Sequence, residues 1–347
     1  MALSHDQILD LVKATQKELG RMKWTEIATD LSHYEVLPKM LKRDRVQFET
    51  GEGLQRNVMT EESGAAKHVG LYNVDDVNVS DVLQNIDVPF RHTTTNYAFD
   101  RREKAMNGGP EQIVDLIRVR RADSMISLAV LLESTFWSKP ADSTDKVTPF
   151  GLFYWIVQNA SEGFNGGNPA GFSSGAGNLS SVTFPRWANY TNSYAASGGV
   201  SKTDLIKKLR KAHRKTDFRS PVDIPDYRTG RGQNYRLYVN ESTISDMEDV
   251  GEGQNENLGR DLAPMDGTIA FRRNPVVYIP KLDDETNNPV FLVNWSVFNI
   301  FFLRGEHLRE EGPDKVASQH NVYQVHVDLT WNTLCTNRRR LGVIYAA

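Results

Sequence analysis

The glycine-rich segment at residues 163–177 is the first candidate for chemistry, because the backbone N–H groups of such loops can bind phosphates. It lacks the Gly-Lys-Ser/Thr ending that supplies the lysine and the metal-binding hydroxyl of a P-loop. It also contains no Gly-x-Gly-x-x-Gly pattern between a strand and a helix. The segment is therefore predicted to be a mobile surface loop without a ligand.

Histidine and cysteine residues offer little for metal binding or nucleophilic catalysis. No two of the 8 histidines lie three to five positions apart: His5, His33, His68, His92, His213, His307, His320 and His326. The single cysteine, Cys335, lies between Leu334 and Thr336 in a strand-like segment, where a small buried or interfacial thiol is expected. With one thiol and no closely spaced histidines, a structural zinc site is not expected.

Clusters of charged residues are the remaining candidates. The acidic pairs Asp75-Asp76 and Asp283-Asp284 lie in turn-like contexts, where solvated carboxylates are expected. Basic clusters, which could form ion pairs between subunits or touch phosphates weakly, occur at Arg101-Arg102 with Lys104, at Lys207-Lys208 with Arg210-Lys211, and at Arg338-Arg339-Arg340. No catalytic, cofactor-binding or metal-binding residue is predicted.

Composition is that of an ordinary globular protein. The 347 residues are 39% hydrophobic and 24% charged, and the formal net charge is −3. Dedicated nucleic-acid binders are usually strongly basic, so this charge argues against one but permits weak contact with DNA. No apolar run is long enough to span a membrane, no secretory signal is expected at the N-terminus, and synthesis in the cytoplasm is predicted.

Helical patterns occur at several places. Ser4 and Gln7 form a capping box before a predicted helix over 4–19, and a short helix is possible at 24–31. The strongest pattern is at 110–137, where Pro110 is suited to the first helical position. There Leu128, Leu131 and Leu132 are predicted to be buried, and the arginines near 118–121 to be accessible. A shorter helix is predicted at 201–215, and 242–249 has the composition of a capped stretch.

Strand-like patterns dominate two regions. Residues 45–105 contain short alternating runs and few core-forming residues, which predicts a long hairpin projecting from a body. A lone hairpin is marginal in water, so this projection predicts oligomerisation. Toward the C-terminus, further strands are predicted at 235–239, 267–271, 276–279, 290–293, 298–303, 322–331 and 342–345.

The order of these segments resembles that of the major capsid proteins of tailed bacteriophages, whose fold is shared with encapsulins. Five short sequence segments also resemble segments of that family: Pro149–Leu152, Gly166–Phe172, Phe184–Tyr190, Ile269–Pro280 and Phe291–Trp295. The resemblance covers nearly the whole chain, and these motifs carry no chemistry.

The resemblance implies an α+β capsid fold with an N-terminal arm (1–40), an extended β-hairpin loop (41–106) and a long spine helix that begins the peripheral domain (107–160). Residues 161–270 would form mainly the axial domain, and 271–347 the return strands of both domains. The implied function is self-assembly, as pentamers and hexamers, into the icosahedral shell around a double-stranded DNA genome. No enzyme activity or cofactor is implied.

The family reading also implies partners: a portal, a separate scaffolding protein and possibly decoration proteins, with weak non-specific contact to packaged DNA and no membrane. The protein would be a virion component assembled in the host bacterial cytoplasm. Some relatives crosslink a lysine of the extended loop to a neighbour. Lys67 is the only lysine between residues 45 and 103, but no partner site is evident, so crosslinking is not expected.

Two other readings stay open. An encapsulin-like compartment would enclose a protein cargo instead of nucleic acid, but its extended loop is usually shorter. A soluble α/β enzyme using the glycine-rich loop would form a small oligomer in solution rather than shells.

Overall fold

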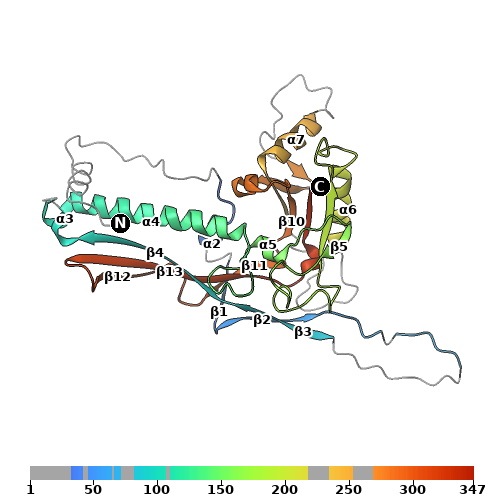
Figure 1. Cartoon of the computed structure of the whole chain (residues 1–347), viewed down its shortest axis with the longest axis horizontal. Helices are drawn as coiled ribbons and strands as arrows, with labels where there is room; N and C mark the ends of the chain where they lie inside the picture. Colours follow the sequence, from blue (N-terminus) through green and yellow to red (C-terminus); the bar gives the residue numbers. More distant parts are fainter. Residues whose placement is uncertain are drawn as a thin grey trace.

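The computed structural model describes residues 33–41, 46–64, 66–71, 82–106, 110–217, 234–252 and 269–347. The predicted helices at 4–19 and 24–31 and the acidic pair at 75–76 lie outside these residues. The described chain is an α+β fold with an elongated part, a more compact part and a projecting hairpin (Figure 1). No helix among the described residues is both long and apolar enough to cross a membrane.

The elongated part combines the longest helix with a five-stranded sheet. Helix α4 (Pro110–Phe136) has 27 residues and is about 40 Å long, which confirms the predicted helix. It lies along β4 (Arg91–Asp100), which pairs with one edge of β13 (Val322–Cys335). The rest of the sheet contains β1 (Gln47–Glu49), β11 (Phe298–Leu303) and β12 (Arg309–Lys315), in the order β1-β11-β13-β12.

The compact part is built on a seven-stranded mixed sheet in the order β5-β6-β14-β10-β7-β9-β8. Its strands are β5 (Gly163–Gly166), β6 (Asn189–Tyr194), β7 (Tyr235–Val239), β8 (Ala270–Phe271), β9 (Asn274–Tyr278), β10 (Val290–Asn294) and β14 (Gly342–Ala346). Every residue of β10 is buried, as expected of a central strand. The strands predicted after residue 234 are therefore confirmed; for the one predicted at 267–271, residues 267 and 268 lie outside the described residues and β8 covers Ala270–Phe271.

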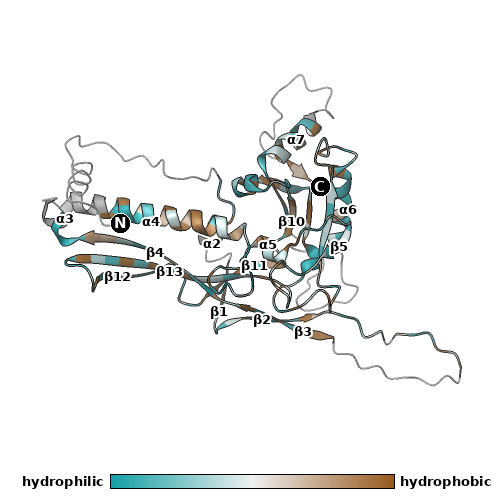
Figure 2. Cartoon of the chain, in the orientation of Figure 1, coloured by the Kyte–Doolittle hydropathy of each residue, from teal (hydrophilic) through white to brown (hydrophobic). Residues whose placement is uncertain are grey.

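Two hydrophobic cores lie on opposite sides of this sheet. The larger one contains the buried side of α4, the hairpin base and one face of β10, including Phe291 and Val293. The smaller one contains Leu292 from the other face of β10, together with α6 (Leu205–Thr216) and α7 (Glu241–Glu252). Figure 2 shows the apolar residues concentrated in the C-terminal half of α4 and in β10.

Short elements complete the fold: α2 (Leu37–Leu41), α3 (Arg101–Met106), α5 (Leu152–Trp155), η2 (Pro280–Asp284) and η3 (Arg338–Arg340). The hairpin consists of β2 (Gly53–Met59) and β3 (Leu83–Pro89), paired from Gly53–Pro89 to Met59–Leu83. It is shorter than the predicted projection, because the chain after Pro89 turns into β4 and pairs with β13 instead of with β2.

Candidate assembly surfaces and the junction that positions them

The groups singled out for chemistry are mostly occupied by structural roles. Cys335 is fully buried in β13, and burial raises the pKa of its thiol to about 12, so the thiolate needed for nucleophilic chemistry is absent near neutral pH. His92 contacts the hydroxyl of Thr330 at 2.7 Å, and His307 contacts the carbonyl of Met40 at 2.8 Å. Among the described residues, no cluster of three or more His, Cys, Asp and Glu side chains could hold a metal ion.

The glycine-rich segment is packed against the body at several positions, so the prediction of a surface loop is wrong for those residues, whereas residues 165, 170, 171, 173 and 174 are exposed. Phe172 is 6% exposed and Ala176 is fully buried. A Cβ atom on Gly166 would lie 2.0 Å from the Asn189 side chain, and one on Gly177 would lie 2.4 Å from Ile86. Gly166 and Gly177 therefore allow close approach of neighbouring segments, which fill the space beside them.

Arg338 holds the start of this segment against the body. Its side chain is fully buried and donates to the carbonyls of Trp155 (2.8 Å), Trp187 (2.9 Å) and Gly167 (2.9 Å), and to the Asn189 side chain (3.2 Å). Burial lowers its pKa to about 10. The prediction that this basic cluster meets phosphates or neighbouring subunits is therefore wrong for Arg338, and also for Arg340, which is 4% exposed.

The other charged clusters are at the surface. Asp283 and Asp284 are exposed, as predicted; Asp283 accepts from the backbone N–H of Glu241 at 2.9 Å. Arg101 and Arg102 are exposed, and Arg102 pairs with Asp100 at 3.0 Å.

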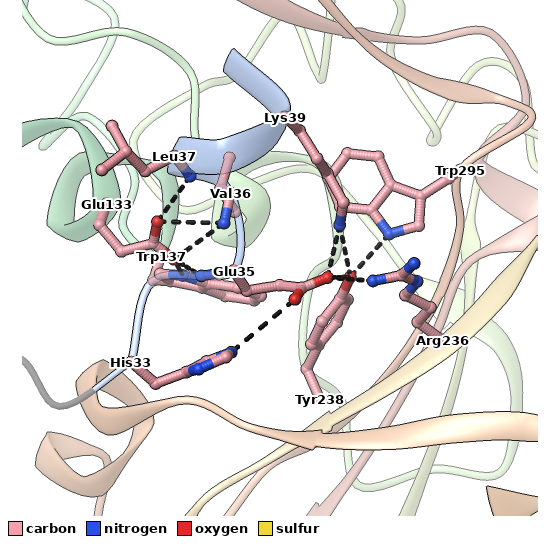
Figure 3. A network of polar contacts seen from close by, with 10 residues as sticks. All are labelled: His33, Glu35, Val36, Leu37, Lys39, Glu133, Trp137, Arg236, Tyr238 and Trp295. Carbon is pink, nitrogen blue, oxygen red and sulfur yellow. Dashed lines mark hydrogen bonds and ion pairs between the residues drawn. The ribbon is translucent and has the colours of Figure 1, made fainter. Parts of the chain in front are cut away.

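A buried junction fixes the segment at residues 33–41 to the end of α4 (Figure 3). The Glu133 carboxylate, on the last turns of α4, is 1% exposed and accepts from the backbone N–H groups of Val36 (3.1 Å) and Leu37 (3.0 Å). It also accepts from the indole N–H of Trp137 at 2.8 Å. These bonds satisfy backbone donors at the start of α2 that have no intrahelical partner.

The same junction reaches the compact part through Glu35 (Figure 3). Glu35 pairs with Lys39 at 2.6 Å and with Arg236 of β7. Lys39 also lies 3.8 Å from the ring centroid of Trp295, and the Trp295 indole donates to the Tyr238 hydroxyl at 2.7 Å. The network therefore joins residues 33–41, helix α4 and the seven-stranded sheet.

Opposing effects set the charges in this junction. Burial alone would raise the pKa of Glu35, but Lys39 and Arg236 outweigh it and hold that pKa below its ordinary value. Burial lowers the pKa of Lys39 to about 8, although Glu35 acts against it. Burial also raises the pKa of Tyr238 well above its usual value, so its hydroxyl stays neutral.

Only part of the predicted spine-helix surface is correct. Leu128 and Leu132 are 2% and 1% exposed, which confirms their burial. Leu131 is 47% exposed, so its predicted burial is wrong; it lies about 100° around the helix axis from Leu132, beyond the edge of the buried side. Arg118 and Arg121 are exposed, as predicted. Arg120 is not: it forms two bonds of 2.8 and 3.0 Å to Glu103, which is 5% exposed.

The hairpin has a buried base and an exposed end. Leu54, Ile86 and Val88 are at most 1% exposed, and the Asp87 N–H donates to the Gly177 carbonyl at 3.1 Å. The prediction that this region lacks core residues is therefore wrong for the base. At the far end the cross-strand pair Met59 and Leu83 is 58% exposed on each side.

Beyond the hairpin the chain extends away from the body (Figure 1), and the described residues there are exposed. They include Val69 at 59% and Leu71 at 91% exposure, and also Lys67. Large apolar side chains on a projection are typical of a surface that a partner covers.

No protein-family model matches the sequence, and no curated protein matches it. Solved structures do resemble the chain. A chain of the cyanophage A-1(L) capsid matches with a TM-score of 0.64 and 15% identity, covering 96% of this chain and 98% of that one. A chain of the native GTA particle capsid matches with a TM-score of 0.59 and 10% identity, over 95% and 97% of the two chains.

A chain of Mycobacterium phage Bobi matches with a TM-score of 0.54 and 8% identity, over 100% of this chain and 99% of that one. At such low identity the agreement is one of fold alone. This protein therefore has, along nearly its whole length, the fold of phage capsid chains.

Proposed function

We propose that the chain is the major capsid protein of a tailed phage and assembles with copies of itself into an icosahedral shell around double-stranded DNA. One observation carries the proposal: a capsid-chain fold presents an apolar hairpin end that no described part of the same chain covers. The similarity of the fold to phage capsid chains is the reason for proposing a structural role rather than an enzymatic one.

In this proposal residues 1–40 act as the arm, 41–106 supply the extended loop, and 107–160 contain the spine helix and begin the peripheral domain. Residues 161–270 form mainly the axial domain, and 271–347 return through both domains. The compact sheet with α6 and α7 supports the axial assignment, and α4 with β4 and β13 supports the peripheral one.

The subunits would form pentamers and hexamers in the host cytoplasm and become part of the virion. A portal, a separate scaffolding protein and possibly decoration proteins are the expected partners. Contact with packaged DNA would be weak and non-specific, since the net charge is −3.

The test replaces the exposed apolar end by polar residues. Met59→Ser, Leu71→Ser and Leu83→Ser together should leave a folded subunit, because all three side chains are at least 58% exposed. The same variant should fail to form shells in negative-stain images. Val147→Ser with Val182→Ser is the matched control, because these side chains are 75% and 83% exposed and belong to neither strand of the hairpin.

Shells of normal size from the hairpin variant would refute the role assigned to this surface. Wild-type protein that stays a small oligomer under all assembly conditions would refute the capsid proposal itself. Purified wild-type particles that enclose a protein cargo and no nucleic acid would replace it with an encapsulin-like compartment.

A further inference from the structure

Helices α6 and α7 cover the same face of the seven-stranded sheet. Leu205 and Leu209 of α6 and Met247 of α7 are buried in one cluster with Leu237 of β7 and Val276 of β9. Each helix has 12 residues and is therefore about 18 Å long. Their sides away from the sheet form the outer surface of the compact part (Figure 1).

The two outer surfaces carry opposite charge. Helix α6 contains six basic residues and no acidic one: Lys207, Lys208, Arg210, Lys211, Arg214 and Lys215. Helix α7 contains five acidic residues and no basic one: Glu241, Asp246, Glu248, Asp249 and Glu252. Figure 2 shows α6 as a strongly hydrophilic helix.

Most of these charges are exposed and have no ion-pair partner among the described residues. On α6 only Lys208 and Lys211 are paired, with Asp204 and Glu162. The other exposed charged side chains of the two helices take part in no ion pair within the described chain. On α6 they are Lys207, Arg210, Arg214 and Lys215, and on α7 they are Glu241, Asp246, Glu248 and Asp249. The charges of the two helices also do not pair with each other there.

A polyanion such as DNA would match α6 alone, but it would be repelled by α7 on the same outer surface. A second copy of this chain matches both helices, since it brings an acidic helix to α6 and a basic helix to α7. The equal lengths of the helices add to this complementarity. Complementary charges of this kind direct association and suppress the wrong register, in which like charges would meet.

We propose that the basic surface of α6 in one subunit docks on the acidic surface of α7 in the next subunit. The inference deepens the proposed shell function and rests on it. Because the two surfaces differ, the contact is head-to-tail, and repeated contacts of this type close into rings when the rotation allows it. The α6–α7 contact would thus join subunits within a capsomer.

A charge swap tests the proposal. The basic-to-acidic variant Lys207→Glu, Arg210→Glu and Arg214→Glu should assemble poorly, because three of the four exposed basic side chains of α6 that have no ion-pair partner among the described residues would become acidic and face the acidic α7. The acidic-to-basic variant Asp246→Lys, Glu248→Lys and Asp249→Lys should fail for the converse reason. A chain carrying all six changes should recover rings and shells, which no general loss of stability could explain. Circular dichroism and melts of unassembled subunits provide the control for folding.

Mixing the two single-helix variants gives a sharper result. Each variant can contact only the other one, so the two must alternate around a ring. An alternating ring needs an even number of subunits, so the mixture should form hexamers but neither pentamers nor closed shells. Native mass spectrometry with one variant isotopically labelled would count both species in each ring.

The outcomes separate the possible explanations. If the basic-to-acidic variant forms normal shells that fail to retain DNA, and the acidic-to-basic variant is unaffected, α6 binds the genome and the proposal is overturned. If both single-helix variants assemble like the wild type, or the six-change chain is not rescued, the α6–α7 contact is wrong while the shell function stands. A wild-type chain that forms neither rings nor shells would overturn the shell function itself.

Discussion

Replacing Leu132 with Ala should destabilise the isolated subunit far more than replacing its neighbour Leu131 with Ala. Leu132 is 1% exposed and belongs to the larger core, so its truncation removes apolar contacts and leaves a cavity, at a cost of about 2–5 kcal/mol. Leu131 is 47% exposed. Full burial of a leucine contributes about 1.5–3 kcal/mol, so roughly half-burial limits the loss at Leu131 to about 1 kcal/mol.

The assay is denaturant unfolding of unassembled subunits, followed by tryptophan fluorescence and far-ultraviolet circular dichroism. The midpoint should fall clearly for Leu132→Ala and little for Leu131→Ala, with similar slopes for both. Both changes leave the same residue on the same helix, so helix propensity cancels in the comparison. Equal losses of stability, or a larger loss for Leu131→Ala, would show that the orientation of α4 described above is wrong.

Three further outcomes are expected. Glu35→Gln should lower the free energy of unfolding at neutral pH, and the difference from the wild type should shrink in acid. The pKa of Glu35 is lowered in the folded state, so its stabilisation is present above the ordinary value of 4.5 and is lost as the pH falls through the folded value. A difference in melts that stays constant across this pH range would contradict the prediction. Cys335 should resist thiol reagents in the native subunit and react in denaturant, because burial raises the pKa of its thiol to about 12. Stoichiometric labelling of the native subunit would contradict this protection. In denaturant melts, Gly177→Ala should lower the free energy of unfolding more than Gly64→Ala does. Both glycines have a positive φ, but only at Gly177 would the new Cβ atom meet a neighbour, Ile86 at 2.4 Å. Equal losses of stability would mean that backbone strain alone determines the effect.

Much of the architecture was predictable because its signals are local. Pro110 and the periodic leucines indicate the helix at 110–136, and alternating β-branched and aromatic residues indicate the strands from 235 onward. Even so, three leucines at nearby positions of one helix do not all share a face: Leu131 and Leu132 differ by about 100° around the axis. Only the packing shows which of the two is buried.

The errors concern residues whose partners lie far away in the sequence. Arg338 reads as part of a basic surface cluster, but its acceptors lie 149 to 183 positions earlier. In the sequence, Glu133 looks like an ordinary solvated carboxylate on a helix. Its burial depends on Val36, which lies 97 positions away and whose backbone N–H donates to it. Similarly, the glycines at 163–177 suggest flexibility, because the sequence does not reveal which side chains occupy the space they leave.

The pairing of β4 with β13 constrains the order in which the molecule can form. Residues 91–100 bond to residues 322–331, so a ribosome must add more than two hundred residues before β4 meets its partner. Until then the backbone groups of β4 on that edge stay open to other chains. Because such long-range pairing is slow and exposes strand edges, this edge is where a newly made chain is open to wrong pairing, and the sheet beneath α4 can be completed only after residues 322–331 have been made.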